Sequence, residues 1–277
     1  MTRMGEYDIM VVIKRKDNGM KIKNYSFITD KLKGSLRLAV VSDLHNREPL
    51  EVIMAVSKIH PDAICIAGDL IEALDGSMDG KNDYGFAALR ALCAIAPVFY
   101  AMGNHEIGAT HGHMRHKPKH KPGEDYITPE NRARILASGA TFLDNNHVEW
   151  KGIRIGGLNS GMLEHDGKPR VDDLQDFFAS DGLKILICHH PEYYDRYLRD
   201  RDVDLVISGH AHGGQWRLFG RGVYAPDQGL FPKYTSGVHE DRLVISRGTS
   251  NTGGIIPRLF NPREVVCIKI NEKEQKR

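Results

Sequence analysis

Five short apolar runs, each followed directly by polar residues, constrain the fold of this chain more than any other feature. The runs are 36–41, 63–67, 98–102, 184–188 and 205–207. Their residues are almost continuously apolar, which is typical of strands that are covered on both faces.

Helical patterns lie between these runs. Apolar residues recur at helical spacing in 49–59 and 84–95, and Thr128-Pro129 is a capping residue followed by a first-turn proline, which predicts a helix to Ser138. Further helices are expected at 171–179 and 192–199, and further strands at 243–246 and 265–270. Alternating strands and helices predict an α/β sandwich.

We expect a single domain over residues 1–277, because no linker or internal repeat divides the chain. Residues 1–34 read as an N-terminal edge hairpin, since Asp17-Asn18-Gly19 is a hairpin-type turn between two weakly alternating segments. Residues 111–122, HGHMRHKPKHKP, are dense in His, Lys and Pro and predict a solvated surface loop. Four histidines there could alternatively hold an adventitious metal.

The polar residues that follow the runs are of the types that bind metals. They are Asp43, His45, Asp69, Asn104, His105, His189, His210 and His212. If the runs are neighbouring strands of one sheet, these side chains converge at the carboxyl edge, where open α/β sheets bind ligands. Any one of the motifs alone would have an ordinary structural explanation, but their joint occurrence after five runs predicts a site.

The donor types favour a particular metal chemistry. Carboxylate and amide oxygens with imidazole nitrogens suit divalent Mn, Fe, Zn or Ni, and thiolates are absent from the set. In Asp43-x-His45 and His210-x-His212 the two side chains fall on the same side of an extended segment. Two metals about 3.5–4 Å apart can activate a shared hydroxide and clamp phosphoryl oxygens. We therefore expect two divalent ions, with Mn in first place.

The motifs D-x-H, G-D, G-N-H-E, H and G-H-x-H, in this order, resemble the calcineurin-like metallophosphoesterase superfamily. The stretches 208–217, 246–250 and 257–262 are similar to a narrower bacterial group, the YkuE/YaeI-like phosphoesterases. The resemblance implies a two-sheet β-sandwich flanked by helices, in four α/β/β/α layers. It also implies a binuclear enzyme that hydrolyses phosphodiesters or phosphomonoesters by attack of a metal-bridging hydroxide.

The resemblance also assigns roles to the residues. It implies that Asp43, His45, Asp69 and His212 bind the first metal, and that Asp69, Asn104, His189 and His210 bind the second. His105 would be the general acid, or would stabilise phosphoryl charge. The acidic residue at the offset of Glu72 orients that histidine in protein phosphatases, so we hypothesise the same here. His190 is given a structural or supporting role beside His189.

Substrate contacts are expected from residues next to the ligands. Asn46 and Arg47 follow the first ligand pair directly, and Arg217 lies shortly after the second. Arg221, Arg247 and Arg258 could also meet phosphoryl oxygens, although each alone reads as a solvated surface residue.

Three alternative functions remain open. One is a peripheral pyrophosphatase on a nucleotide-linked lipid precursor, with an apolar site from residues such as Tyr224, Leu230 and Phe231. Another is a nuclease, which the formal charge of +2 disfavours because extended duplex binding needs many phosphate contacts. The third is a non-catalytic binding scaffold, which is disfavoured because every expected ligand position is filled.

Composition limits the location and the partners. The polar first ten residues lack a signal-peptide core, and no apolar run is long enough to span a bilayer. We expect a cytoplasmic protein with a phosphate-ester substrate, possible peripheral membrane contact and no transmembrane segment. The four cysteines contain no C-x-x-C pair and are expected to be reduced. The oligomeric state cannot be derived from the sequence.

Overall fold

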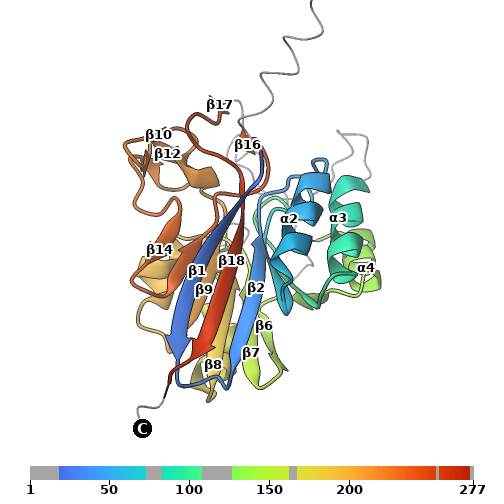
Figure 1. Ribbon diagram of the computed structural model, residues 1–277, viewed down its shortest axis with the longest axis vertical. Helices are drawn as coiled ribbons and strands as arrows, with labels where there is room; N and C mark the ends of the chain where they lie inside the picture. The colour runs from blue at the N-terminus through green and yellow to red at the C-terminus, as the bar shows by residue number, and fades with distance from the viewer. Residues whose placement is uncertain (1–18, 73–82, 108–126, 162–166, 254–255, 275–277) are drawn as a thin grey trace, which may run out of the picture.

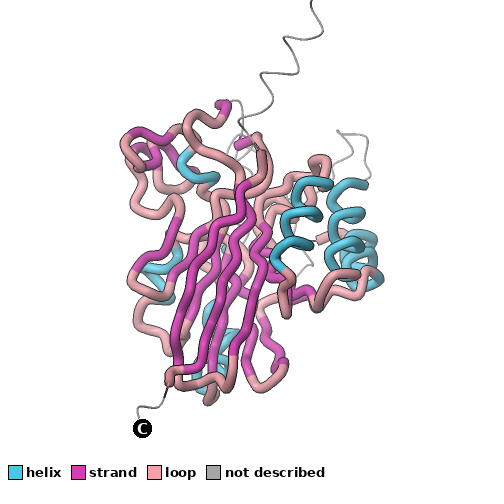
Figure 2. Tube along the Cα trace, in the orientation of Figure 1, coloured by secondary structure: helices cyan, strands magenta, loops and turns pink. Residues whose placement is uncertain are grey.

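The computed structural model describes residues 19–72, 83–107, 127–161, 167–253 and 256–274. Two six-stranded sheets are stacked face to face, and helices cover the outer face of each sheet (Figures 1 and 2). This arrangement confirms the predicted four-layer sandwich. The predicted first strand of the N-terminal hairpin and the segment 111–122 lie outside the described residues.

The first sheet has the strand order β1-β18-β2-β3-β4-β5. Its strands are β1 (Lys21–Thr29), β2 (Ser35–Val41), β3 (Ala63–Ala67), β4 (Val98–Ala101), β5 (Thr141–Leu143) and β18 (Glu264–Glu272). Strands β2 to β5 are parallel, and β18 runs antiparallel to β2. The edge strand β1 pairs in parallel with β18, so its partner comes from the opposite end of the chain.

The second sheet has the order β14-β15-β9-β8-β7-β6. Its strands are β6 (Asn146–Trp150), β7 (Ile153–Leu158), β8 (Leu183–Cys188), β9 (Leu205–Ser208), β14 (Gly237–His239) and β15 (Leu243–Ile245). Strands β7, β8, β9 and β15 are parallel, with antiparallel β6 and β14 at the edges. The five apolar runs are therefore divided between two sheets, and the expectation of one shared sheet edge is wrong.

Helices form the outer layers. On the first sheet these are α2 (Leu50–Ile59), α3 (Asp83–Cys93) and α4 (Pro129–Ala137). Thr128 caps α4 as predicted, because its Oγ1 accepts a hydrogen bond from the backbone N–H of Asn131 at 3.2 Å. On the second sheet they are the 3₁₀ turn η2 (Val171–Leu174), the short helix α5 (Gln175–Ala179) and the π-helical turn η3 (Tyr194–Leu198). The helix expected at 171–179 is thus divided into a 3₁₀ turn and a short α-helix over the same residues, and the one expected at 192–199 is shorter than predicted.

Three buried apolar clusters correspond to the three interfaces between layers. The first lies between α2, α3, α4 and the first sheet, and includes Phe86 and Tyr100. The second lies between the two sheets, with Phe99 and Ile185 among its members. The third packs η2, α5 and η3 on the second sheet and includes Phe177. The nearly continuous apolar strands are explained by this double coverage.

A region of short strands follows β9. It contains β10 (Arg217–Leu218), β11 (Arg221–Gly222), β12 (Tyr224–Ala225) and β13 (Gly229–Leu230), with β16 (Thr252–Gly253) and β17 (Ile256–Pro257) near the end of the chain. In Figure 1 this region lies above the second sheet. All four cysteines have free thiols. Among the described helices, none has the length and apolar character needed to cross a lipid bilayer.

Candidate metal centre

The carboxyl ends of β2, β3, β8 and β9 meet although they belong to two sheets. Hydrogen bonds join them directly: His189 Nδ1 donates to the carbonyl of Ala67 at 2.6 Å, and the N–H of His210 donates to Oδ1 of Asp43 at 3.0 Å. Face-to-face stacking places the two sets of strand ends next to each other. The predicted ligands therefore converge for a different reason from the one expected.

Several of the predicted ligands have a left-handed backbone. The φ angles are positive at Asp43 (55°), His45 (52°), Asp69 (55°), His210 (65°) and His212 (46°). Non-glycine residues seldom adopt this conformation, and clusters of such residues occur at functional sites where the surroundings hold them in place. Each of these residues turns the chain sharply at the end of a strand. The turn directs its side chain to the junction of the two sheets.

The donor atoms of these side chains lie at the spacing that two ligands of one ion would have. Donors 2.1 Å from a metal and 90–109° apart are separated by about 3.0–3.4 Å. His45 Nε2 lies 3.2 Å from His212 Nε2, and His212 Nε2 lies 3.5 Å from Asp43 Oδ1. On the other side, His189 Nε2 lies 3.1 Å from Asp69 Oδ2. The residues present therefore fit two adjacent cations.

Asp69 lies between the two groups of donors. Its Oδ2 is 3.1 Å from His189 Nε2 and 3.8 Å from His45 Nε2. The donor atoms of Asp43, His45 and His212 lie within 4.8 Å of one another, and so do those of Asp69, His189 and His210. A carboxylate in this position is close to both groups, and its bridging role stays a prediction.

Hydrogen bonds to the outer ring nitrogens favour the tautomer that a metal requires. His189 Nδ1 must donate to the Ala67 carbonyl, which leaves the Nε2 lone pair facing the site. His45 Nδ1 contacts Oε1 of Glu72 at 2.9 Å, and His210 Nε2 contacts Oδ2 of Asp227 at 2.8 Å. Carboxylates that accept from a ligating imidazole orient the ring and raise its basicity.

Two buried polar atoms support the metal interpretation. Asp43 Oδ2 and His189 Nε2 are inaccessible to solvent and make no well-aligned hydrogen bond among the described residues, although Asp69 Oδ2 lies 3.1 Å from His189 Nε2. Leaving such groups unsatisfied costs about 1–3 kcal/mol each, and more for charged groups. A cation in each donor group would remove this cost.

Burial and neighbouring charges shift the pKa values of the site residues in opposite directions. Burial would raise the pKa of Asp69, but the imidazoles of His189 and His105 hold it well below its usual range. Burial lowers the pKa of His189, and Asp69 overcomes this and raises it to about 10. Burial lowers the pKa of both His210 and His212. Neutral imidazole is the form that binds a metal, so the lowered pKa values favour metal binding by His210 and His212.

His105 and Glu72 form a pair at the edge of the site. Burial lowers the pKa of His105, but Asp69 and a 2.6 Å hydrogen bond from its Nδ1 to Glu72 Oε2 raise it to about 9. The pKa of Glu72 falls to about 2, because its bonds with His105 and His45 outweigh the effect of burial. Glu72 thus contacts both a predicted ligand and the predicted acid, as the hypothesis of an orienting carboxylate requires.

Glu106 clamps two of the site loops together. Its Oε2 accepts from the N–H groups of Asp69 at 2.9 Å and Gly103 at 2.8 Å, and its Oε1 accepts from Leu70 N–H at 2.7 Å and Tyr100 Oη at 2.6 Å. Three short N–H donors and a phenol favour the ionised carboxylate, against burial and the charge of Asp69, which raise the pKa of Glu106. This residue joins the loop after β3 to the loop after β4.

The other predicted residues differ in their surroundings. Asn104 is buried after β4 beside the site loops. Asn46 accepts from the N–H of Gly85 at 2.9 Å, and Arg47 is exposed. Arg217 donates to the Gly213 carbonyl at 2.7 Å and to Thr235 Oγ1 at 3.3 Å, so its guanidinium braces its own loop.

His190 has partners at both ring nitrogens. Its Nδ1 lies 2.8 Å from Glu192 Oε1, and its Nε2 lies 2.7 Å from Ser160 Oγ. Its ring is close to that of His210, with centroids 4.3 Å apart. His190 therefore packs against a predicted ligand, which agrees with a supporting role.

The sequence did not predict the roles of three residues near the site, Asp227, Glu106 and Arg258. Asp227 was missed because it lies 17 positions after His210 in a segment with no recognisable motif. Glu106 belongs to the G-N-H-E motif, but its role was not inferred. Arg258 was expected to be a solvated surface residue or a contact to phosphoryl oxygens, and its Nη2 lies 3.4 Å from His212 Nδ1. Burial lowers its pKa to about 10.

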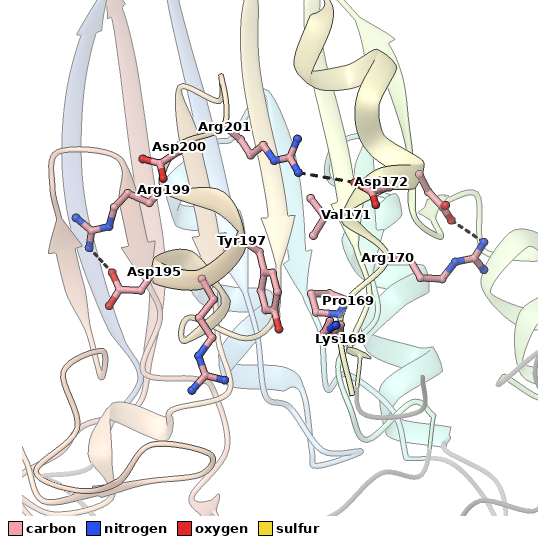
Figure 3. Close-up of a pocket in the computed structure, with 12 residues that line it drawn as sticks. Lys168, Pro169, Arg170, Val171, Asp172, Asp195, Tyr197, Arg199, Asp200 and Arg201 are labelled. Atoms are coloured by element: carbon pink, nitrogen blue, oxygen red, sulfur yellow. Dashed lines mark hydrogen bonds and ion pairs between the residues drawn. The ribbon is translucent and has the colours of Figure 1, made fainter. Parts of the chain in front are cut away.

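A separate cavity of about 510 Å³ lies between the 168–173 segment and the turns around η3 (Figure 3). Arg170, Asp172, Asp195 and Arg199 are among its lining residues, and the charges are paired: Arg199 contacts Asp195. None of the predicted ligands lines this cavity. It is not the metal centre.

Residues 36–214 match the family model described as calcineurin-like phosphoesterase. The Campylobacter jejuni protein Cj0846, named an uncharacterized metallophosphoesterase, is 27% identical over an alignment that covers 96% of this chain and 68% of that protein. Bacillus subtilis YkuE, with the same description, is 27% identical over 77% of this chain and 70% of its own length. The solved structure of TT1561 from Thermus thermophilus has 14% identity and a TM-score of 0.38, and covers 63% of this chain and 81% of its own.

Proposed function

The chain belongs to the calcineurin-like phosphoesterase family, a family of metal-dependent phosphoester hydrolases, and on that premise we propose that it uses two divalent metal ions held by seven side chains. The ligands are Asp43, His45, Asp69, Asn104, His189, His210 and His212. The observation that carries this proposal is the position of Asp69, whose Oδ2 lies 3.1 Å from one histidine nitrogen and 3.8 Å from another in a different donor group. We propose Mn as the metal, with Fe, Zn or Ni as alternatives, because the donors are nitrogen and oxygen.

When bound, the two ions supply a hydroxide nucleophile at neutral pH and neutralise charge on the phosphoryl oxygens. The protein's own residues then do three things. Asp43 and His45 after β2, with His212 after β9, hold one side of the site, and Asn104 after β4, His189 after β8 and His210 after β9 hold the other. The buried Asp69 joins the two sides. The strand ends are rigid, so the donors are preorganised.

His105 is proposed as the general acid. Its Nδ1 donates to Glu72, so the Nε2 is the nitrogen that can give a proton to the leaving oxygen. Its side chain is 26% exposed, which leaves it accessible to a substrate, whereas His189 is fully buried. Glu72 and Asp69 stabilise the protonated ring, as an acid requires. Asn46 and the exposed Arg47 are the proposed substrate contacts.

The test combines metal content with turnover. Chelator-treated protein is dialysed against Mn, its bound metal is measured, and hydrolysis of bis-p-nitrophenyl phosphate is compared with that of p-nitrophenyl phosphate. We expect two Mn per chain and metal-dependent turnover. The variant Asp69→Asn should bind less than two, and His105→Ala should bind two while kcat falls about 10²- to 10⁴-fold.

Asp176→Asn is the matched control, because Asp176 is an exposed carboxylate on α5. It should retain both metals and full turnover. Full activity in Asp69→Asn, or one metal per wild-type chain at saturation, would contradict the binuclear proposal. A preference for the diester would direct the search for the substrate to diesters and pyrophosphates, and a preference for the monoester to phosphatase substrates.

A further inference from the structure

Large apolar side chains are exposed together in the region of short strands after β9. Thirteen exposed large hydrophobic residues occur in the described part of the chain, and eight of them lie here. We call these eight the apolar rim: Trp216, Leu218, Phe219, Tyr224, Leu230, Phe231, Leu259 and Phe260. Single exposed apolar residues are ordinary, but a concentration of them marks an interaction surface.

Backbone hydrogen bonds hold the segments that carry the rim next to one another. β10 pairs with β11, and β12 pairs with β13, so both hairpins present their ends to solvent. The N–H of Phe231 donates to the Val223 carbonyl at 2.8 Å, and Val223 N–H donates to Trp216 at 2.8 Å. Arg217 N–H donates to Leu259 at 3.0 Å, which attaches the late segment. Figure 1 shows β10 and β12 beside each other at the top of the molecule.

Three phenylalanines of the rim occupy unfavourable positions. Phe219, Phe231 and Phe260 have φ angles of 49°, 52° and 53°. Their exposed fractions are 105%, 77% and 74%. Turn positions with positive φ are normally filled by glycine or asparagine. A bulky apolar residue there costs backbone energy and exposes a phenyl ring to water, which is expected only where another surface covers the ring.

Two hollows beside the rim indicate the chemistry of that surface. One, of about 190 Å³, is lined by apolar side chains that include Trp216, Tyr224 and Leu230. The other, of about 440 Å³, is lined by ten residues that include three cations, Arg217, Arg221 and Lys233, and no carboxylate. Lys233 pairs with Asp195 at 2.9 Å and Arg217 donates to its own loop, whereas Arg221 is exposed to solvent. Apolar tips that project between cations match the boundary between acyl chains and anionic headgroups. A two-fold contact with a second copy would instead bring these cations together.

The rim is attached to the loops of the metal centre. Asp227, in the turn between β12 and β13, contacts Nε2 of His210 at 2.8 Å. Asn261, next to Phe260, donates its amide to the His212 carbonyl at 2.7 Å. A surface that covers the rim would thus lie next to the site, so phosphates at that surface would be its nearest substrates.

We propose that the apolar rim docks onto a bilayer of anionic phospholipids and that the ester hydrolysed at the metal centre is carried by a membrane lipid. The docking follows from the rim and its cations alone. The lipid substrate rests on the proposed function.

The test of docking uses the full chain and vesicles, with no need for turnover. Protein is mixed with vesicles of phosphatidylcholine, or of phosphatidylcholine with phosphatidylglycerol, and bound protein is separated by flotation. We expect binding to the anionic vesicles that weakens at high salt, because charge attraction is screened. Of the two tryptophans, Trp216 is in the rim. Its fluorescence should be quenched by brominated acyl chains, and the quenching should disappear in Trp216→Phe.

Two variants and two controls separate docking from loss of folding. The triple variant Phe219→Ser, Phe231→Ser, Phe260→Ser should lower the partition coefficient at least about tenfold. Its control replaces three exposed apolar residues on other surfaces, Ile28, Met54 and Leu136, by Ser and should bind as the wild type does.

The charge variant Arg221→Glu should lower the partition coefficient at least about fivefold. Its control is Arg90→Glu, at an exposed position of α3. Because all these side chains are exposed, the variants should keep the wild-type circular dichroism. An equal loss of binding in variants and controls would overturn the proposal.

Docking would also be refuted if wild-type protein stays unbound by anionic vesicles, or if the folded triple variant binds fully. If the wild-type protein is a dimer that does not bind vesicles, and the triple variant is a monomer, the rim is the interface with a second copy. Turnover of the soluble diester is measured in parallel. If it is present while docking fails, only the membrane proposal falls. If docking succeeds and neither the soluble diester nor lipid phosphates in the vesicles are hydrolysed, the proposed function falls, and the lipid substrate with it.

Discussion

Replacing Glu106 by Gln should destabilise the protein more than most single substitutions. The two carboxylate oxygens accept from three N–H groups at 2.7–2.9 Å and from the phenol of Tyr100 at 2.6 Å. An amide offers one acceptor oxygen and one NH₂ group. The best orientation keeps the oxygen on Asp69 and Gly103 and lets Tyr100 turn to accept. The N–H of Leu70 then faces the NH₂ group and has no acceptor.

The magnitude follows from these contacts. A buried donor without a partner costs about 1–3 kcal/mol, and two hydrogen bonds that lose their charge weaken by roughly 1 kcal/mol each. The free energy of unfolding should therefore fall by about 3–5 kcal/mol, a large part of the roughly 5–15 kcal/mol of a typical domain. The same change loosens the loop that carries Asp69, so metal binding should weaken as well.

Urea unfolding of metal-free protein, followed by circular dichroism, measures this free energy. Glu130→Gln is the control, because Glu130 is exposed in the first turn of α4 and should change stability by less than about 0.5 kcal/mol. A loss below about 1 kcal/mol in Glu106→Gln would mean that the clamp is not held by an ionised carboxylate. That result would refute the assignment of Glu106.

Three further predictions concern the hydrogen-bond partners of the site. Asp227→Asn should weaken metal binding at His210 about 10- to 100-fold, because the carboxylate that orients the ring is lost. Titration calorimetry with Mn measures this affinity, and an unchanged value would mean that the contact is incidental. Glu72→Gln should lower kcat and move the alkaline limb of the pH–rate profile to lower pH, because His105 loses the anion that raises its pKa. An unchanged rate and profile would show that Glu72 has no part in the mechanism. In metal-free protein, the free energy of unfolding should fall as pH rises from 6.5 to about 10. In the folded state the pKa values of His105 and His189 are raised to about 9 and about 10, so both residues lose their stabilising protons over this range. Urea midpoints that stay constant over this range would contradict the last prediction.

Local patterns were enough to predict most of the secondary structure near the site. Strands β2, β3, β4, β8 and β9 were expected because each is a short continuous apolar run. Strand β6 was missed because its sequence NHVEW is mostly polar, as an edge strand with partly exposed residues can be. The position of β1 beside β18 could not be predicted from the sequence either, because their pairing joins opposite ends of the chain.

The site was predictable to the extent that its residues follow strands. Asp43, Asp69, His189 and His210 each come directly after, or within a few positions of, an apolar run. Asp227 has no such signal, because its place at His210 depends on how the region after β9 folds back. The paired contacts of Glu72 likewise require two loops to meet.

The sequence predicted most of the strands and helices near the site, the donor types and the order of the metal-binding motifs, because periodicity and residue chemistry act over a few neighbouring positions. The assignment of each strand to its sheet and the distances from Asp69 Oδ2 to the histidines of two donor groups came only from the tertiary structure. It alone gathered the apolar rim, which joins residues 216–231 to 259–260. The physical reason is that these arrangements depend on contacts between distant segments, whose geometry is set by the packing of whole layers rather than by any local pattern.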